Sequence, residues 1–456
     1  MSPVHMTASE RRAAVSLAAI FSIRMLGLFM ILPVFALYAE ELEGVTSTQV
    51  GMAIGAYGLT QALLQLPFGM LSDRIGRKPV IAAGLLIFAI GSVVAALATT
   101  IEGVILGRAL QGSGAVAAAV MALAADLTRE DHRTKAMALI GISIGLSFVV
   151  AMVAGPLLNH WIGVPGIFAL TAVLALGSIG LLYLAVPTPE RTTFHRDAEA
   201  EPAQFGRVLR DGQLLRLDFG ILVLHLVLTA SFVVLPLSLR DSGFLPAQHW
   251  QLYLPVMVAA MALAVPFIII AEKRRRMKQV FSGAVAVLLL SLLALVWGHN
   301  HFWAIALLLL SFFTAFSLLE ATLPSLVSKV APAQSKGTAM GVYTSSQFIG
   351  AFLGGASGGL IHDMFGNGGV FLFCSALAAL WLLAALSMRE PRYLAVEMLR
   401  VGALDAGRAA ALEQRLLAIG GVAEANVNVD DGIAYLKVDS RVVDRDALSQ
   451  FSAAGS

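Results

Sequence analysis

Four ionisable residues lie inside long apolar segments, where a charge is costly: Arg24, Arg108, His225 and Glu320. A charge at the centre of a bilayer costs at least about 2.5 kcal/mol on insertion scales, so such residues face a partner or a polar cavity. Burial moves the proton affinity of carboxyl and imidazole groups. We therefore predict proton coupling, first at Glu320 and then at His225. The competing interpretations are a hydrogen-bonded packing role for His225 and a structural, snorkelling role for Arg108.

A second polar group lies within the apolar segment at residues 48–71. Tyr57, Gln61 and Gln65 follow one another at four-residue spacing and therefore share one face of a helix. Together with Arg24 they are candidates for substrate binding. The alternative is that they only form hydrogen bonds to neighbouring helices.

A short charged loop joins the apolar runs 50–71 and 80–97. It reads Gly-Met-Leu-Ser-Asp-Arg-Ile-Gly-Arg-Lys and carries the glycines, carboxylate and cations Gly69, Asp73, Arg74, Gly76, Arg77 and Lys78. A carboxylate at this position can face the N-terminus of a neighbouring helix. We expect Arg77 to pair with Asp126, which ends the fourth apolar segment. A loop that only sets topology would need cations but no acid.

The elements that position these residues are membrane helices. Hydrophobic residues make up 58% of the 456-residue chain and charged residues 13%, against about 25% charged residues in soluble proteins. The net charge of +2 indicates no nucleic-acid partner, and the single cysteine excludes an internal disulfide and a thiolate metal cluster. Apolar runs compatible with a core of about 30 Å lie near 14–38, 48–71, 79–98, 102–126, 136–160, 165–186, 217–239, 249–271, 279–297, 302–328, 338–362 and 368–388.

The distribution of Lys and Arg predicts the orientation of these twelve spans. Alternate loops hold nearly all of the cations, whereas the opposite loops hold only Arg240 beside several acids. Positive loops stay in the cytoplasm, so both termini and the charged loop are expected there. Arg108 and Asp126, five helical turns apart, are expected on one face of the fourth span.

The chain divides into four predicted regions. Residues 1–187 form an N-terminal six-helix half, 188–216 a polar linker, 217–392 a C-terminal six-helix half, and 393–456 a small tail domain. The segment 272–278 occupies the place of the charged loop in the second half, with an acid and cations but no glycine. It is a degenerate copy, as expected of an internal repeat.

The tail domain has the pattern of a small α+β fold. Alternating residues predict strands near 393–399, 422–429 and 433–438, with a hairpin signal at Asp430-Asp431-Gly432. Helical spacing covers 405–419 and 444–451, with Asp405 as N-cap. The order β-α-β-β-α resembles a ferredoxin-like fold without its last strand. It also resembles heavy-metal-associated domains but lacks their Cys-x-x-Cys, so no metal site is predicted.

The charged loop matches the pattern Gly-x-x-x-Asp-Arg-x-Gly-Arg-Arg/Lys, which resembles the signature loop of major facilitator superfamily transporters. Arg108-Ala-Leu-Gln-Gly-Ser-Gly114 resembles that family's fourth-span motif, in which the arginine is associated with proton transfer. Gly155-Pro156 resembles part of the motif of its drug–proton antiporters and predicts a helix kink. Ala151, Asn159 and His160 depart from that motif, which weakens the inference of antiport and of drugs as substrates.

The resemblance implies an all-α membrane fold of twelve helices in two six-helix halves, working by alternating access in a bacterial inner membrane. Spans one, four, seven and ten would line its cavity, and each carries one of the four buried ionisable residues. Asp73 would lock the cytoplasmic side in the outward-open state against the start of the eleventh span, which carries Gly337 and Gly341.

The expected function is proton-coupled export of a small molecule that the sequence does not identify, with protons and the lipid bilayer as partners and no cofactor. The alternatives are proton symport of a metabolite and a membrane sensor that uses the tail domain. Four interpretations of that domain stay open: it regulates transport, it senses a halide or another small ligand, it promotes self-association, or it has no role. The enzyme signatures HExxH, a Gly-rich phosphate loop and a nucleophile elbow are missing, so no enzyme is predicted.

Overall fold

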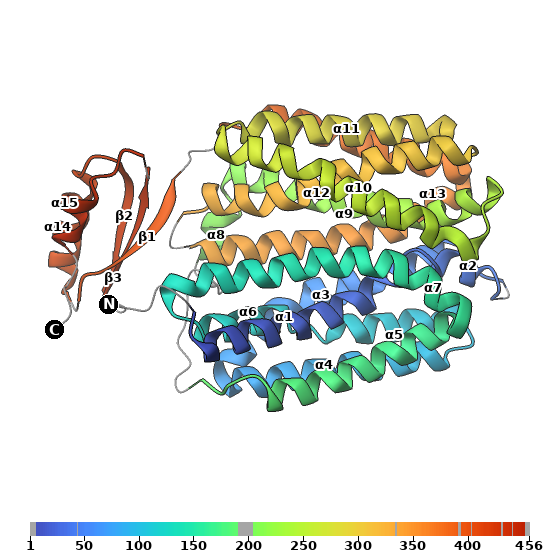
Figure 1. The fold of residues 1–456 in the computed structure, drawn as a ribbon, viewed down its shortest axis with the longest axis horizontal. Coiled ribbons are helices and arrows are strands. Elements are labelled where there is room, and N and C mark those ends of the chain that lie inside the picture. Colours follow the sequence, from blue (N-terminus) through green and yellow to red (C-terminus); the bar gives the residue numbers. More distant parts are fainter. Residues whose placement is uncertain are drawn as a thin grey trace.

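The protein is a long helical bundle with a small α+β domain at one end (Figure 1). The structure is a computed structural model that describes residues 6–42, 44–189, 204–332, 335–390, 394–402, 404–429, 432–439 and 441–451. Much of the predicted linker 188–216 and the turn residues Asp430 and Asp431 lie outside these ranges. We call the end of the bundle beside the tail domain the tail end. The opposite end, where the second span begins, is the distal end.

Helices of the first half follow the predicted apolar runs closely. They are α1 (Ala8–Phe29), α2 (Phe35–Ala39), α3 (Ser47–Ile75), α4 (Arg77–Leu97), α5 (Ile101–Ser113), α6 (Ala117–Asp126) and α7 (Glu130–Leu184). The second half contains α8 (Phe205–Val208), α9 (Gly212–Asp241), α10 (His249–Lys273), α11 (Met277–Gly298), α12 (Phe302–Val330) and α13 (Lys336–Leu386).

The predicted twelve membrane spans are present. Over the described ranges, nine helices are long and apolar enough to cross a membrane. Two of these, α7 and α13, each contain a glycine with positive φ, at Gly163 (φ 65°) and Gly366 (φ 66°), where two helices meet. Each therefore supplies two spans, and the 29-residue helix α3 supplies the remaining one. The arrangement confirms the predicted fold class.

Two spans that the sequence suggested as continuous are broken. The first span stops at Phe29 and resumes as α2 after a turn that contains Pro33. The fourth span is split into α5 and α6 beside Gly114, where an added Cβ would overlap the carbonyl oxygen of Gly84 on α4. Because the helix is interrupted, the expectation that Arg108 and Asp126 share one continuous helical face is wrong.

Glycines bring the two halves together at the distal end. A Cβ at Gly51 on α3 would overlap the carbonyl oxygen of Gly355 on α13, and a Cβ at Gly359 would overlap that of Ser47. Gly55 and Gly58 approach the backbone of α13 in the same way. Small residues are what close packing of membrane helices requires. The distal parts of α3 and α13 are therefore in backbone contact.

The tail domain confirms the predicted β-α-β-β-α order. It consists of β1 (Ala395–Arg400), α14 (Ala406–Leu417), β2 (Val422–Asn428), β3 (Ile433–Val438) and α15 (Arg445–Ser449). The antiparallel strands lie in the order β1-β3-β2, as in a ferredoxin-like sheet without its fourth strand. Asp405 caps α14 by accepting the backbone N–H of Arg408 at 2.8 Å, as predicted.

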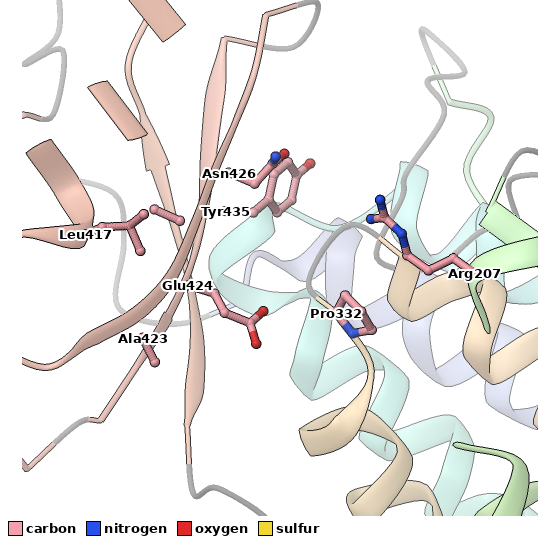
Figure 2. Close-up of a pocket in the computed structure, with 8 residues that line it drawn as sticks. Arg207, Pro332, Leu417, Ala423, Glu424, Asn426 and Tyr435 are labelled. Atoms are coloured by element: carbon pink, nitrogen blue, oxygen red, sulfur yellow. The ribbon is translucent and has the colours of Figure 1, made fainter. Parts of the chain in front are cut away.

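The tail domain contacts the second half through β3 and the residue that follows it. Arg275, in the degenerate loop between α10 and α11, donates to Asp439 at 2.9 Å. The ammonium group of Lys437 donates to the carbonyl oxygen of Lys329 at 3.3 Å. Beside these contacts is a cleft of about 370 Å³. Tyr435, Asn426 and Glu424 line it from the sheet, and Arg207 and Pro332 from the bundle (Figure 2).

Neutralising Asp439 is expected to loosen this docking. Hydrogen bonds from Arg275 lower the pKa of the Asp439 carboxyl. The contribution of the pair is therefore complete above the usual pKa of about 3.8 and is lost as the pH falls through the lowered value. An ion pair that is open to solvent contributes little to stability. At neutral pH, Asp439→Asn should raise amide hydrogen exchange up to about fivefold in the segment 432–439. Unchanged exchange would show that the pair does not hold the domain.

Candidate functional site

A cluster of polar side chains joins three helices of the second half. His225 on α9 lies with its Nε2 2.8 Å from the amide nitrogen of Gln347 on α13. The same Nε2 lies 3.5 Å from Oε1 of Glu320 on α12. His225 is 9% exposed, whereas 33% of the Glu320 side chain is exposed although it lies within a membrane-spanning helix. Two of the three predicted proton-coupling residues, Glu320 and His225, are therefore in contact.

The geometry of this cluster suits a group that changes its protonation state. With the Gln347 amide donating to Nε2, the His225 ring is neutral and carries its proton on Nδ1. After an amide flip, the Gln347 oxygen would instead accept a proton donated by Nε2. A protonated imidazole at 3.5 Å would also favour the ionised form of Glu320. The charge on His225 would thus alter the surroundings of Glu320, whose Oε1 is buried without a hydrogen-bond partner in this conformation.

Two further buried polar residues on the same helices were missed in the sequence. Asp218 lies two helical turns before His225 on α9, is 6% exposed, and has one carboxylate oxygen without a hydrogen-bond partner. Tyr343 lies one turn before Gln347 on α13 and is 4% exposed. The seven-residue spacing of Asp218 and His225 was the available signal, because it places both on one helical face.

The predicted substrate-binding residues form a buried network in the first half. Arg24 on α1 donates to the amide oxygen of Gln61 on α3, and the Gln61 nitrogen lies 3.4 Å from the oxygen of Gln65. The Arg24 guanidinium carbon lies 5.7 Å from the centre of the Tyr57 ring and 6.0 Å from that of Phe88. All four predicted residues are at most 4% exposed.

The charge of Arg24 has no acidic partner among the described residues. Its Nε and Nη1 atoms are buried without a hydrogen-bond partner, and so is the hydroxyl group of Tyr57. Stacking of a cation on aromatic rings compensates part of the desolvation cost. A buried guanidinium without a carboxylate is nevertheless a costly arrangement, which is typical of a functional position.

Arg108 is buried and does not snorkel to the surface. Its guanidinium donates to Oε1 of Gln111 at 2.8 Å and to the carbonyl oxygens of Ala53 and Ile54 at 3.4 Å. It also lies 5.2 Å from the centre of the Tyr57 ring. These contacts orient α5 against α3. None of these contacts tests the predicted role of Arg108 in proton transfer, which stays a prediction.

The two networks lie next to each other across the boundary between the halves. Phe348 on α13 follows Gln347 directly, and its ring centre lies 6.2 Å from that of Tyr57 on α3. One turn of α13 therefore touches the cluster around His225 and the cluster around Arg24. A movement of α13 against α3 would alter both environments together.

The charged loop is a tight turn at the tail end. Gly76 alone separates α3 from α4, with φ 100° and ψ 148°, a conformation that favours glycine. Arg77 is buried and pairs with Asp126 at 3.2 Å, as expected, and also with Asp73. The side chain of Lys78 donates to the carbonyl oxygen of Val186 at 2.6 Å. These contacts hold the loop against the first half.

The expected lock between Asp73 and the eleventh span is not formed in this conformation. Within the described chain, Asp73 makes its polar contact with Arg77, and its side chain is 35% exposed. Gly337 and Gly341 lie in the first turns of α13, the proposed partner. Arg74 is exposed beside Asp73, and Gly69 lies against α6, where an added Cβ would be 3.1 Å from Ala118.

The glycine of the partial antiporter motif packs against the break in the first span. A Cβ at Gly155 would lie 2.5 Å from the carbonyl oxygen of Met30 and 3.0 Å from Pro33. Helix α7 continues through Pro156, and its non-helical backbone angles occur at Gly163. The kink at Pro156 stays a prediction. In the described ranges, no group of three His, Cys, Asp or Glu side chains could hold a metal ion.

Known proteins resemble this chain in sequence and fold. Residues 17–355 match the Major Facilitator Superfamily, and residues 404–452 match the YajR YAM domain. The inner membrane transport protein YajR of Escherichia coli is 48% identical over 450 residues, covering 99% of each chain. Multidrug resistance protein 1 of Bacillus subtilis is 25% identical, covering 82% of this chain and 95% of that one. A bacterial homologue of the human lysosomal transporter Spinster, solved inward-facing and occupied, has a TM-score of 0.68 at 14% identity, covering 84% and 96%.

Proposed function

The chain belongs to the major facilitator superfamily of membrane transporters, and we propose that it exports a small molecule in exchange for protons. The contact between Glu320 and His225 carries this proposal. Glu320, whose side chain is one-third exposed, lies among three helices of the second half. The two halves must move against each other during alternating access. Protonation of Glu320 would then change the balance between the two open states.

The direction of transport is inferred from the relatives and from charge. Several relatives are named multidrug resistance proteins, which is consistent with efflux. The bias of Lys and Arg supports a cytoplasmic location of the tail end. The halves are in backbone contact at the distal end, and Asp73 is exposed at the tail end. With that orientation, the halves are in contact on the periplasmic side.

The environment of Arg24 favours a substrate with an anionic or strongly electron-rich group. Two of its nitrogen atoms lack partners, and no described carboxylate pairs with it. A substrate oxygen that accepts from these donors would remove a desolvation penalty that Gln61 relieves only in part. Arg24→Gln should weaken binding of such a substrate about tenfold or more, since hydrogen bonds to charged groups contribute about 1.5–3 kcal/mol. A thermal-shift titration would measure this loss, and equal affinity for the variant would contradict it.

A proton-movement assay tests export against symport. A thermal-shift screen against metabolites and antibiotics first identifies a ligand. The ligand is then added outside inside-out vesicles that have an acidic interior and contain a pH-sensitive dye. Antiport predicts that the interior becomes more alkaline as substrate enters and protons leave. A more acidic interior would indicate symport, and a saturable ligand that moves no protons would contradict proton coupling.

Asp73→Asn is expected to lower transport at least about tenfold without preventing membrane insertion. The carboxylate is proposed to stabilise the outward-open state at the N-terminus of α13, an interaction that an amide reproduces poorly. Transport and the amount of protein in the membrane are measured in the same vesicles. The matched control is Glu102→Gln, since Glu102 accepts from Gln49 within the first half. Normal transport by Asp73→Asn would exclude the lock.

A further inference from the structure

A carboxylate of the second half binds the first turn of a helix in the first half. Asp363 on α13 accepts the backbone N–H groups of Ser47 and Thr48, each at 2.9 Å, and the hydroxyl group of Thr48 at 2.6 Å. The adjacent His362 lies with Nδ1 2.7 Å from the hydroxyl oxygen of Ser47. Ser47 and Thr48 are the first two residues of α3.

These contacts have a clear electrostatic basis. The first N–H groups of a helix lack partners within the helix and carry the positive end of its dipole. Charge-assisted hydrogen bonds from such groups to a carboxylate are stronger than neutral ones. Thr46 caps the same helix from within the first half by accepting the N–H of Gln49. Asp363 therefore adds a bond between the halves to a helix start that already has its own cap.

The contacts exist only while the distal ends touch. Gly359, one turn before Asp363 on α13, has no side chain to separate its backbone from the carbonyl oxygen of Ser47. A second ion pair between the halves, from Arg240 at the end of α9 to Glu40, lies at the same end. If the halves separate at the distal end, the hydrogen bonds from the N-terminus of α3 to Asp363 are broken.

Asp363 mirrors the position of Asp73. Helices α3 and the first segment of α13 run in opposite directions, because Gly51, Gly55 and Gly58 meet the backbone at residues 355, 352 and 348 in turn. Each helix therefore ends at the end of the bundle where the other begins. Asp73 lies in the last turn of α3, and Asp363 lies just before Gly366, which ends the first segment of α13. In this conformation Asp363 accepts hydrogen bonds from the N-terminus of α3, whereas Asp73 pairs with Arg77 and not with the N-terminus of α13.

We infer that Asp363 is the latch of the distal end, which holds the bundle closed there by capping α3. It acts in alternation with Asp73, so that each carboxylate stabilises one of the two end states. This inference goes beyond proton-coupled export, because it concerns the conformational balance in the absence of substrate and protons.

Distances between spin labels test the latch without transport. Trp161 in α7 and Trp303 in α12 are 70% and 81% exposed, lie near the distal end and belong to different halves. Both are replaced by cysteine in a Cys374→Ser background and labelled in the full-length protein. Asp363→Ala removes the cap. It should raise the population with long distances between the labels about tenfold relative to the population with short distances. Asp363→Asn, which keeps the side-chain shape, should give a smaller increase.

Two comparisons make the outcome specific. Glu102→Ala removes another distal carboxylate, which accepts from Gln49 within the first half, and should leave the ratio unchanged. Asp73→Ala should shift the ratio in the opposite direction, toward short distances. A distribution unaltered by both substitutions of Asp363, or altered equally by Glu102→Ala, would overturn the latch. Because neither substrate nor a proton gradient is involved, that failure would leave the export proposal standing.

Discussion

Replacing Glu320 with glutamine is expected to reduce proton-coupled transport about a hundredfold, the lower limit typical of losing a positioned proton carrier. Glutamine preserves the size of the side chain and its helix propensity, and it can still form a hydrogen bond near His225. It cannot take up or release a proton. Substrate binding should therefore survive while substrate-driven proton movement is lost.

The measurement combines two assays on the same preparation. The vesicle assay reports proton movement, and a thermal-shift titration reports substrate affinity. Glu102→Gln is the matched control, because Glu102 lies at the start of α5 and accepts from Gln49, away from the cluster. Proton movement at the normal rate in Glu320→Gln would exclude this carboxylate as the carrier. Loss of both binding and proton movement would instead indicate that Glu320 binds substrate.

His225→Gln separates positioning from proton transfer. If His225 only holds Glu320 in place, a glutamine that keeps a hydrogen-bonding group near it should lower the rate less than Glu320→Gln does, by about tenfold or below. An equal loss in both variants would show that the imidazole itself carries the proton. The 3.5 Å separation between Nε2 and Oε1 makes either transfer geometrically feasible.

Hydropathy and turn chemistry were sufficient to predict most of the fold. Apolar runs of membrane-spanning length marked the helices, and period-2 and helical spacing marked the tail domain. The pairing of Arg77 with Asp126 also followed from the sequence, because Arg77 begins the third span and Asp126 ends the fourth, at the same end of one half. The breaks in the first and fourth spans could not be predicted from Pro33 and Gly114, since proline and glycine are tolerated within membrane helices. Only the structure shows that the helices stop near these residues, at Phe29 and at Ser113.

The sequence predicted the candidate site less completely, for two physical reasons. Glu320 and His225 were recognised as separate buried charges, but their contact depends on the rotation of α9 against α12, which packing decides. Asp218 and Asp363 were missed because acids near the ends of apolar runs resemble ordinary interfacial residues. The docking of Asp439 on Arg275 joins residues far apart in the sequence and had no local signal.

Glycine at position 51 is expected to be indispensable for closing the distal end. A Cβ there would overlap the backbone carbonyl oxygen of Gly355, and backbone cannot yield by changing rotamer. Gly51→Val should therefore keep the distal ends apart, stall alternating access, and reduce transport at least about tenfold. Unlike loss of the Asp363 cap, which changes only the balance between states, this substitution should remove the closed state itself.

Gly177→Val provides the comparison for this prediction. Gly177 lies in the second segment of α7, is exposed, and has nothing within 4 Å of an added Cβ. Both variants place the same β-branched residue in a membrane helix, so propensity and insertion costs are matched. Gly51→Val should show only long distances between labels at positions 161 and 303, whereas Gly177→Val should keep the parent distribution. Short distances and full transport in Gly51→Val would mean that α3 and α13 need not touch for the cycle to proceed.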